Sequence, residues 1–217
     1  ASPAVYTSDL AMSLSNLANC LSAVGERDGA LVAAREAVEL YRGLAEASPA
    51  VYTSDLAMSL SNLAIRLSEV GERDGALVAA HEAVELYRGL AEASPAAYVP
   101  CLAASLSNLA NCLSAVGKRD GALVAAREAV ELYRGLAEAS PAAYTPDLAG
   151  SLSNLATILS EVGERNEALE AAREAVRLRR ALVEASPQAY TPDLAMSLNN
   201  LAIRLSAVGE RNEALEA

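Results

Sequence analysis

Several residue types are scarce or missing in this chain, and each absence argues against a class of function. Of 217 residues, none is tryptophan or phenylalanine, one is histidine and three are cysteine. The histidine, His81, has no second histidine or cysteine at ligand spacing, so we expect no metal site and no cofactor. The odd cysteine count builds no disulfide framework. We therefore expect buried or half-buried thiols at Cys20, Cys101 and Cys112, in a reducing, cytoplasmic compartment.

Long apolar runs and a basic surface are also missing. Hydrophobic residues make up 53% of the chain, but serine, asparagine, glutamate and arginine interrupt every run. No stretch reaches the roughly 18 uninterrupted apolar residues of a membrane span, and no signal peptide is evident at the start. With 28 acidic against 17 basic residues, the net charge is −11. That excess argues against a nucleic-acid partner, which requires a basic face, and favours a neutral or basic protein partner.

Signatures of catalysis are absent as well. The chain has no G-x-x-x-x-G-K-[ST] phosphate loop, no G-x-S-x-G nucleophile elbow and no H-E-x-x-H metal helix. Its carboxylates recur with the same spacing as the rest of the sequence, which a unique active site would not require. We expect no enzymatic activity.

What the chain does have is a segment repeated at a fixed interval. The stretch SLSNLANCLSAVG, ending at Gly25, returns with few changes every 46 residues, and its copies end at Gly71, Gly117, Gly163 and Gly209. Self-similarity at one period predicts stacked supersecondary units within a single repeat domain, residues 1–217. The repeats are 1–46, 47–92, 93–138, 139–184 and a truncated 185–217.

The first half of each repeat has the pattern of a helix, which we call helix A. Apolar residues from Leu10 to Val24 recur at steps of three and four, which predicts a buried stripe on a helix over residues 8–24. Thr7 is the predicted N-cap, and Tyr6 is expected to precede the helix. Prolines one position after this threonine site in later repeats would occupy the first turn. Gly25 is expected in a left-handed C-terminal conformation.

The second half predicts another helix, helix B. A helical stripe runs from Ala30 to Ala45, Asp28 is the expected N-cap (Asn166 and Asn212 later), and the helix should end near Glu46. Tyrosines in the stripe are expected to pack in the core, and Arg179 replaces one of them in the fourth repeat. Glycines inside helix B indicate local crowding or a slight bend. The outer charges read as solvated surface with pairs three and four residues apart on the same helix.

These residues resemble the tetratricopeptide repeat. The signature W-x2-L-G-x2-Y, a glycine, A-x3-F, an alanine and a proline is matched in spacing by Leu14, Leu17, Ala18, Leu21, Gly25, Ala30, Ala34, Ala37 and Pro49. Leucine and alanine replace the family's aromatics, and the period is 46 rather than about 34. The longer unit looks like the kinesin-light-chain type, also common in large multidomain bacterial proteins. The resemblance implies an all-α fold, an α-solenoid forming a right-handed superhelix of antiparallel helix pairs, with helix A inside.

By the same resemblance, the inner face of helix A would be a concave groove that binds a peptide or protein segment. An asparagine recurs opposite the apolar stripe in every repeat, and its amide can donate to and accept from a bound backbone. Two arginines, which take the place of Cys20 in the second and fifth repeats on the same predicted exposed face of helix A, are candidates to pair with a ligand carboxylate. The expected groove residues are Asn16, Asn62, Asn108, Asn154, Asn200, Arg66 and Arg204.

Three alternatives remain open at this stage. In the first alternative, the positions of helix A that differ between repeats are simply exposed, and the asparagines bond a neighbouring helix or a backbone carbonyl. The near-identical repeats stack head to tail into oligomers or filaments, in which case polar substitutions at Leu201 and Leu205 should abolish assembly. In the third alternative, the repeats were engineered toward a consensus sequence. The scattered differences between repeats favour natural drift instead.

Overall fold

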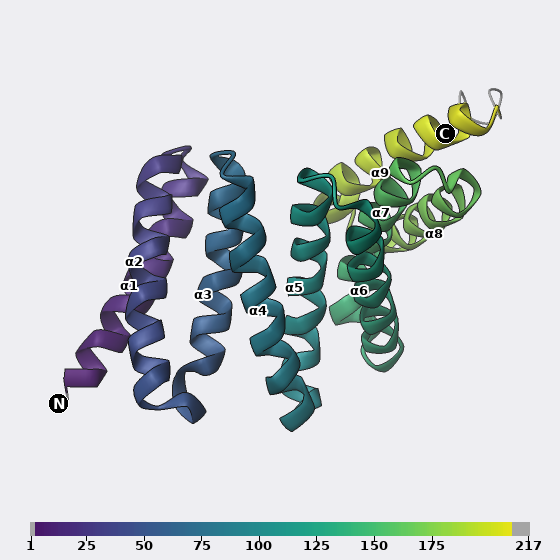
Figure 1. Ribbon diagram of the computed structural model, residues 1–217. Coiled ribbons are helices and arrows are strands. Elements are labelled where there is room, and N and C mark those ends of the chain that lie inside the picture. The colour runs from purple at the N-terminus through teal and green to yellow at the C-terminus, as the bar shows by residue number, and fades with distance from the viewer. Residues whose placement is uncertain (1–2, 210–217) are drawn as a thin grey trace. The chain divides into compact units, whose positions relative to one another are not determined.

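The protein is built from helices alone over the residues that its computed structural model describes, 3–209, with side chains from residue 6 onward. Nine helices follow one another along these residues, joined by short turns (Figure 1). Their bounds are α1 Pro3–Ala23, α2 Arg27–Ala47, α3 Pro49–Glu69, α4 Arg73–Ala93, α5 Pro95–Ala115, α6 Arg119–Ala139, α7 Pro141–Glu161, α8 Arg165–Ala185 and α9 Pro187–Val208. Odd-numbered helices are therefore helix A, and even-numbered ones are helix B.

Helix A starts earlier than the apolar pattern predicted. In α3 the first helical residue is Pro49, preceded by Ser48. Proline suits this position because its missing N–H would have no partner there. The predicted N-cap role of the threonine is therefore wrong. Thr53 lies inside α3 and donates a hydrogen bond from its hydroxyl to the carbonyl oxygen of Pro49, 2.7 Å away. The tyrosine expected before the helix, Tyr52, also lies inside it.

The same shift changes the role of the later prolines. Pro100, Pro146 and Pro192 were expected in the first turn but lie inside α5, α7 and α9. Each removes one backbone donor from the helix. The loss falls in the second turn, five residues after the proline that begins each helix.

The turn from helix A to helix B follows the prediction. Gly71 has a φ of +83°, and the equivalent glycines of the other repeats also have positive φ. The N–H of Gly71 donates to the carbonyl of Ser68, and the N–H of Glu72 donates to the carbonyl of Leu67. This pair of bonds is a Schellman motif, which satisfies carbonyls left open at the helix end.

The N-cap of helix B is not the predicted one. Glu26 holds that position in α2, and Asp28 lies in the first turn. Asn166 is likewise inside the first turn of α8, while Asn212 lies outside the described residues. A carboxylate in the first turn still favours the helix, because it faces the positive end of the helix dipole.

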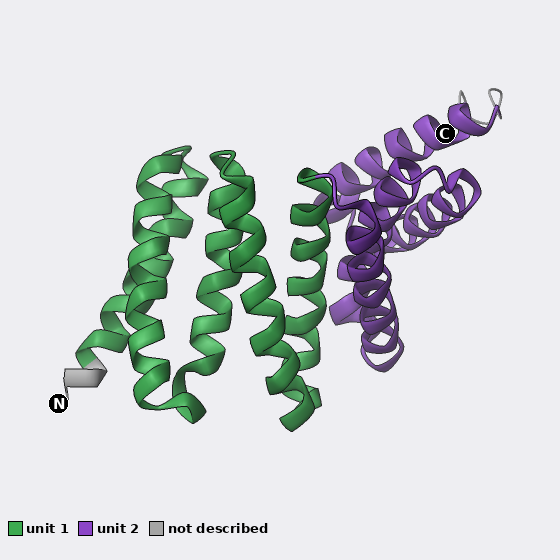
Figure 2. Ribbon diagram, in the orientation of Figure 1, with its two compact units in different colours: residues 1–116 green, residues 117–217 purple. Residues whose placement is uncertain are grey.

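The chain divides into two compact units, residues 1–116 and 117–217 (Figure 2). Within each unit, every helix packs on the next one along the chain. The short turns make these neighbours antiparallel. Helices A also approach one another, α1 with α3, α3 with α5, and α7 with α9. Over the described residues, the backbones of α2 and α4, or of α6 and α8, show no such approach. Each unit is thus a stretch of α-solenoid with helix A inside and helix B outside.

The core of each unit consists of leucine and alanine ridges between successive helices. Leu60 of α3 is 2% exposed and Ala83 of α4 is 0% exposed. The tyrosines of helix B, such as Tyr87, are buried as predicted. The stripe fails only in α1, where Leu10 is 50% and Leu17 is 47% exposed. Buried equivalents of these two leucines pack against a preceding helix B, and α1 has none among the described residues.

One described helix, α5, is long and apolar enough to cross a membrane by length and composition. It occupies the same place in its repeat as α3 and α7, and eight of its residues are buried in the protein. It is more apolar than α3 because Cys101 and Cys112 stand where α3 has Asp55 and Arg66. Its composition is that of a core helix.

Candidate functional site

The predicted asparagines lie along helix A. Asn16 of α1 is exposed, and Asn62, Asn108, Asn154 and Asn200 are half-buried. In unit 1, Asn108 lines a hollow of about 410 Å³ between α3 and α5. Its lining comes from these two inner helices alone: Ala64, Ile65, Ser68, Glu69, Asn108, Asn111 and Cys112. Asn108 therefore borders the space between two neighbouring helices A.

The asparagine amides of this row differ from the nearby serines in their hydrogen bonding. Among the described residues, none of the five asparagine side chains makes a hydrogen bond. Serines join the inner helices instead. The hydroxyls of Ser61 in α3 and Ser105 in α5 are 3.0 Å apart. The interpretation that the asparagines bond a neighbouring helix therefore finds no support in the described part of the chain. The two serines of the S-L-S-N segment, which recurs in the first four repeats, were the sequence signal for these contacts, and our reading of the sequence missed it.

The two arginines lie between inner helices rather than extending freely from them. The side chain of Arg66 is 12% exposed, and its Nη1 lies 3.1 Å from Oε2 of Glu69. Arg204 donates to the hydroxyl of Thr157 on the preceding helix A, at 3.1 Å. Burial lowers the pKa of Arg204, and the nearby carboxylate of Glu161 opposes that shift. Each arginine has a buried Nε without a hydrogen-bond partner.

The position in helix A that Arg66 and Arg204 occupy was predicted to lie on an exposed face. That prediction is wrong for the third and fourth repeats. The position holds Cys112 in α5, which is 6% exposed, and Ile158 in α7, which is 2% exposed. Only Cys20, in α1, is exposed there, contrary to the buried or half-buried thiol that we expected. The reason is that successive inner helices pack closely enough to cover the residue that faces the preceding one.

A second column of residues connects each helix B to the next helix A. Tyr41 of α2 is buried close to Asp55 of α3. Burial raises the pKa of Tyr41, and the charge of Asp55 adds to the shift. Burial also raises the pKa of Asp55. In the next repeat the pair becomes Tyr87 and Cys101, and burial again raises the tyrosine pKa.

The outer side carries grooves that the sequence reading did not find. A groove of about 610 Å³ lies between α2 and α4 of unit 1, and leucines of α3 form its floor. A groove of about 660 Å³ lies between α6 and α8 of unit 2, and leucines of α7 form its floor. The two are built from equivalent positions 92 residues apart, such as Leu60 and Leu152. We call them the first and second outer grooves.

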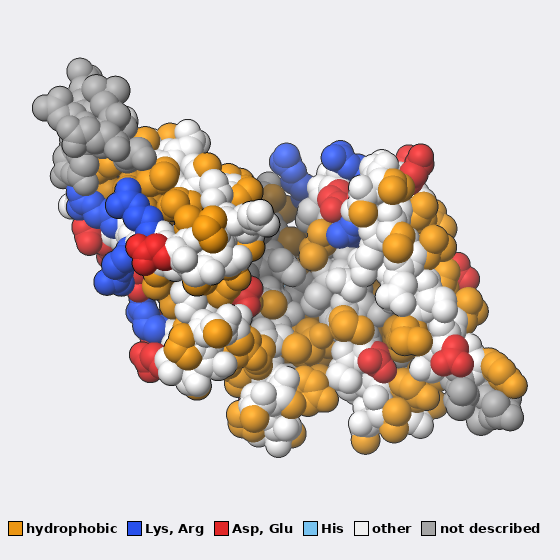
Figure 3. Space-filling model, turned by 180° about the vertical axis from the view of Figure 1, so that it is seen from behind, with side chains coloured by type: hydrophobic (Ala, Val, Ile, Leu, Met, Phe, Trp, Pro, Cys, Tyr) orange, Lys and Arg blue, Asp and Glu red, His pale blue; other side chains and the backbone are white. Residues whose placement is uncertain are grey.

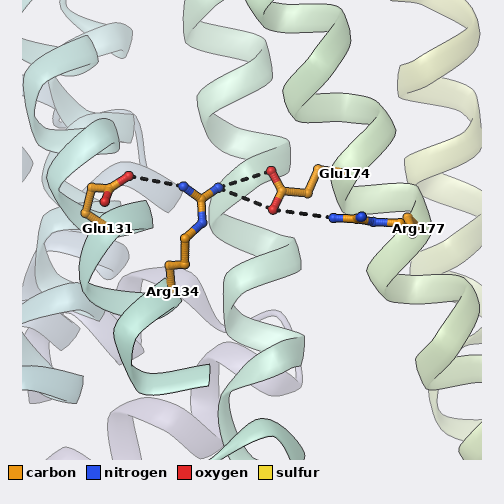
Figure 4. Close-up of polar contacts among 4 residues, drawn as sticks. All are labelled: Glu131, Arg134, Glu174 and Arg177. Atoms are coloured by element: carbon orange, nitrogen blue, oxygen red, sulfur yellow. Dashed lines mark hydrogen bonds and ion pairs between the residues drawn. The ribbon is translucent and has the colours of Figure 1, made fainter. Parts of the chain in front are cut away.

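Arginine–glutamate pairs join the helices on either side of each outer groove. Arg42 of α2 lies 2.5 Å from Glu82 of α4, and Arg134 of α6 lies 3.1 Å from Glu174 of α8 (Figure 4). The sequence pattern predicted pairs within one helix, such as Arg134 with Glu131 at 3.2 Å. The longer-range pairs form because a long arginine side chain spans the space between two helices B.

The described residues contain no group of three histidine, cysteine, aspartate or glutamate side chains able to hold a metal ion. Figure 3 shows a face on which hydrophobic side chains are widespread and charged side chains lie in small groups. The chemistry that these surfaces offer is hydrogen bonding and apolar contact.

Paired antiparallel helices repeated along a solenoid, with a polar inner row, define a repeat scaffold for protein–protein interaction. The tetratricopeptide repeat model matches residues 10–47, 56–93, 102–139, 148–188 and 194–217. The chain belongs to the tetratricopeptide repeat family, and the 46-residue interval between the matches confirms the long-repeat prediction. No curated protein sequence matches the chain.

Solved structures share this fold at low sequence identity. BtubC (BKLC) from P. vanneervenii has a TM-score of 0.76 and 22% identity, over 98% of this chain and 78% of its own. A putative kinesin light chain with nearly identical TPR-like repeats from Podosopora anserina has a TM-score of 0.71 and 21% identity, over 97% of this chain and 92% of its own. MamA has a TM-score of 0.57 and 15% identity, over 97% and 87%. The kinesin-light-chain type of repeat is thus the fold to which this chain is similar.

Proposed function

We propose that this chain binds a peptide segment of a partner protein along the inner surface of helix A. The observation that carries the proposal is the hollow between α3 and α5, where the amides of Asn108 and Asn111 border the space and the asparagine row makes no side-chain bond among the described residues. An extended peptide has backbone N–H and C=O groups that need partners. One amide side chain can satisfy one of each.

The arginines enter the proposal as partners for a ligand carboxylate. Arg66 already pairs with Glu69, so an acidic ligand group would compete with that glutamate. Arg204 is desolvated, which strengthens an ion pair made with it. We therefore place the asparagines as the main contacts and the arginines as secondary ones. A cytoplasmic setting and a bacterial source remain predictions from the sequence.

The test begins with a peptide selected from a random-sequence library on the purified chain, whose Kd is then measured by calorimetry. Asn62→Ala and Asn108→Ala should each weaken binding about fivefold to tenfold, the equivalent of one hydrogen bond. Val32→Ser, on the outer side of α2, is the control and should bind as the parent does. Unchanged affinity in both asparagine variants would remove these residues from the proposal.

A second measurement tests whether the asparagines bind the peptide backbone. The selected peptide is N-methylated at one backbone nitrogen at a time, which removes a single donor. If the Asn108 side chain accepts a hydrogen bond from that N–H, the losses of binding free energy caused by methylation and by Asn108→Ala should not add, because both changes remove the same bond. Strict additivity at every nitrogen would show that the amide does not bind the backbone.

Self-association is the second candidate, and the exposed leucines of α1 favour it. Leu10 is 50% exposed, whereas its equivalents Leu56 and Leu102 are each 6% exposed. Light scattering across a concentration series would detect assembly, and Leu10→Ser with Leu17→Ser should abolish it. Val124→Ser, at an exposed valine of an inner repeat, is the control. Leu201 and Leu205 are unsuitable sites for this test because they are buried, at 7% and 0% exposure.

A further inference from the structure

The two outer grooves have the same architecture but different charge. Both have an apolar floor from helix A and arginine–glutamate pairs that span from one helix B to the next. In the first outer groove, Arg35–Glu72 and Arg42–Glu82 are such pairs, each 2.5 Å long. The two arginines are seven residues apart on α2, two helical turns or about 10 Å. The space between the two bridges is therefore a slot whose base is made by Leu60, Leu63 and Leu67 of α3.

Carboxylates are in excess in the first outer groove. Its lining holds Glu39, Glu72, Asp74 and Glu82 against Arg35 and Arg42. Glu72 and Glu82 are taken up by the bridges. Among the described residues, Asp74 is in no ion pair. The main cause of the raised pKa of Arg42 is the hydrogen bond that it donates to Glu82, and Glu39 adds only a longer-range attraction. Both Glu39 and Asp74 are exposed, so the slot presents two open negative charges.

In the second outer groove, each of the four lining carboxylates pairs with an arginine. Glu131 and Glu174 both contact Arg134, and Glu174 also lies near Arg177 (Figure 4). Glu170 pairs with Arg173 at 3.2 Å. Asn166 is the equivalent of Asp74 in the first groove, and Glu170 is the equivalent of Val78. This groove is therefore both less acidic and less apolar than its counterpart.

Val78 adds an apolar wall to the first groove only. It is 67% exposed and lines the slot from α4. An exposed valine next to a leucine floor gains from being covered, and the neighbouring Asp74 favours a cation. The occupant that fits both features has an apolar side chain flanked by lysine or arginine.

We propose that the first outer groove is a second interaction surface, which binds a basic, apolar segment of a partner protein between the Arg35–Glu72 and Arg42–Glu82 bridges. The apolar side chains of that segment cover Leu63 and Val78, and its cations lie against Glu39 and Asp74. The site is on the opposite side of the solenoid from the asparagine row and does not depend on it. The second outer groove binds the same segment more weakly.

The experiment uses the whole chain and a synthetic peptide of about 15 residues with leucine and lysine in a helical pattern. Two control peptides separate the contributions: one has serine in place of each leucine, and the other has glutamate in place of each lysine. Methyl NMR locates the binding by following Val38 and Val78 in the first groove, and Val130 in the second. Calorimetry gives the affinity.

The expected result is that Val38 and Val78 shift at lower peptide concentration than Val130 does, and that both control peptides bind at least tenfold more weakly. A variant carrying Asp74→Asn and Val78→Glu has the residues of the second groove at these two positions, so it should fold and should lose at least tenfold in affinity. Asn108→Ala should bind the leucine–lysine peptide as the parent chain does.

Three outcomes would overturn the proposal. Equal binding of the serine peptide would show attraction by charge alone. Unchanged affinity of the Asp74→Asn, Val78→Glu variant would show that the groove is not the site. Loss of binding in Asn108→Ala would place the peptide on the inner surface, a result that would leave the function proposed for that surface intact.

Discussion

The guanidinium of Arg179 in α8 donates a hydrogen bond to the backbone carbonyl of Asp193 in α9, 2.8 Å away. It also donates to the hydroxyl of the buried Ser197. Arg179 is 9% exposed and occupies the place that tyrosine holds in the three preceding repeats. The fourth repeat thus attaches the following helix A through a buried cation, whereas the others use an aromatic ring.

This substitution makes the first stability prediction. Arg179→Ala should lower the free energy of unfolding by about 2 kcal/mol, because it opens a cavity and removes the partner of a buried hydroxyl. Arg179→Tyr should not destabilise, and should stabilise by about 1 kcal/mol, because a packed neutral side chain avoids the desolvation of a charge. Chemical denaturation of the three proteins measures both changes. A tyrosine variant as unstable as the alanine variant would contradict the argument.

Replacing glycine by alanine should have opposite effects on stability at two positions. Gly71 has a φ of +83°, whereas Gly89 lies inside α4, and an added Cβ would meet nothing within 4 Å at either position. Gly71→Ala should destabilise by about 1 kcal/mol through backbone strain. Gly89→Ala should stabilise by about 0.5–1 kcal/mol through helix propensity. The open space at Gly89 shows that the local crowding expected inside helix B is wrong.

Thermal denaturation of the two glycine variants gives the comparison directly, because size and chemistry of the change are the same. Only the backbone conformation differs. If both variants shift Tm in the same direction, the left-handed turn is not what requires glycine.

Two equivalent leucines should differ in their importance for stability. Leu60 is 2% exposed in α3, and its counterpart one repeat earlier, Leu14, is half-buried in α1. Leu60→Ala should cost about 2–5 kcal/mol, the range for a buried leucine that leaves a cavity. Leu14→Ala should cost clearly less, because its surroundings already admit water. Urea denaturation with matched m-values measures the difference, and equal losses would mean that α1 is as tightly packed as the inner helices.

Asp55 predicts a dependence of stability on pH. Burial raises its pKa in the folded protein above the unfolded value. The unfolded chain therefore loses this proton first as pH rises, and ionisation favours unfolding. The contribution of Asp55 to stability is greatest below the unfolded pKa of about 3.9 and is lost as pH rises through the folded pKa.

Asp55→Asn removes this titration. At pH 7 the variant should have a higher Tm than the parent, and the gap should close as pH falls to about 3, where the parent carboxyl is protonated in both states. Tm measured across that range in both proteins is the test. A gap that is independent of pH would show that the change acts through something other than the charge.

Local features of the fold could be predicted from particular residues. The glycine at the end of helix A is needed for a left-handed turn, and the leucine steps place Leu56, Leu60 and Leu67 on one buried face. The predicted start of helix A was wrong because a proline earlier in the chain, and not the threonine, begins the helix. Thr7 and its equivalent Thr53 have good capping side chains, but Pro49 starts helix A one turn earlier, since proline is compatible with the first helical position.

The candidate sites were less predictable for a different reason. A helical wheel places Arg66 and Cys112 opposite the apolar stripe, but it describes one helix and cannot show that the preceding helix A covers that position. The outer grooves were missed for the converse reason. Each one needs two helices B and the helix A between them, and residues 40 apart such as Arg42 and Glu82 become neighbours only in the folded chain.

The sequence alone determined that 46-residue repeats form helix pairs, because periodic apolar residues can be buried only on one face of a helix and against an adjacent repeat. The tertiary structure decided which of the remaining side chains are accessible. Inner helices rich in alanine and serine approach closely and cover their flanks, while outer helices stay apart and leave grooves that arginine and glutamate span. These spacings depend on side-chain volumes summed over three helices, which no single repeat contains.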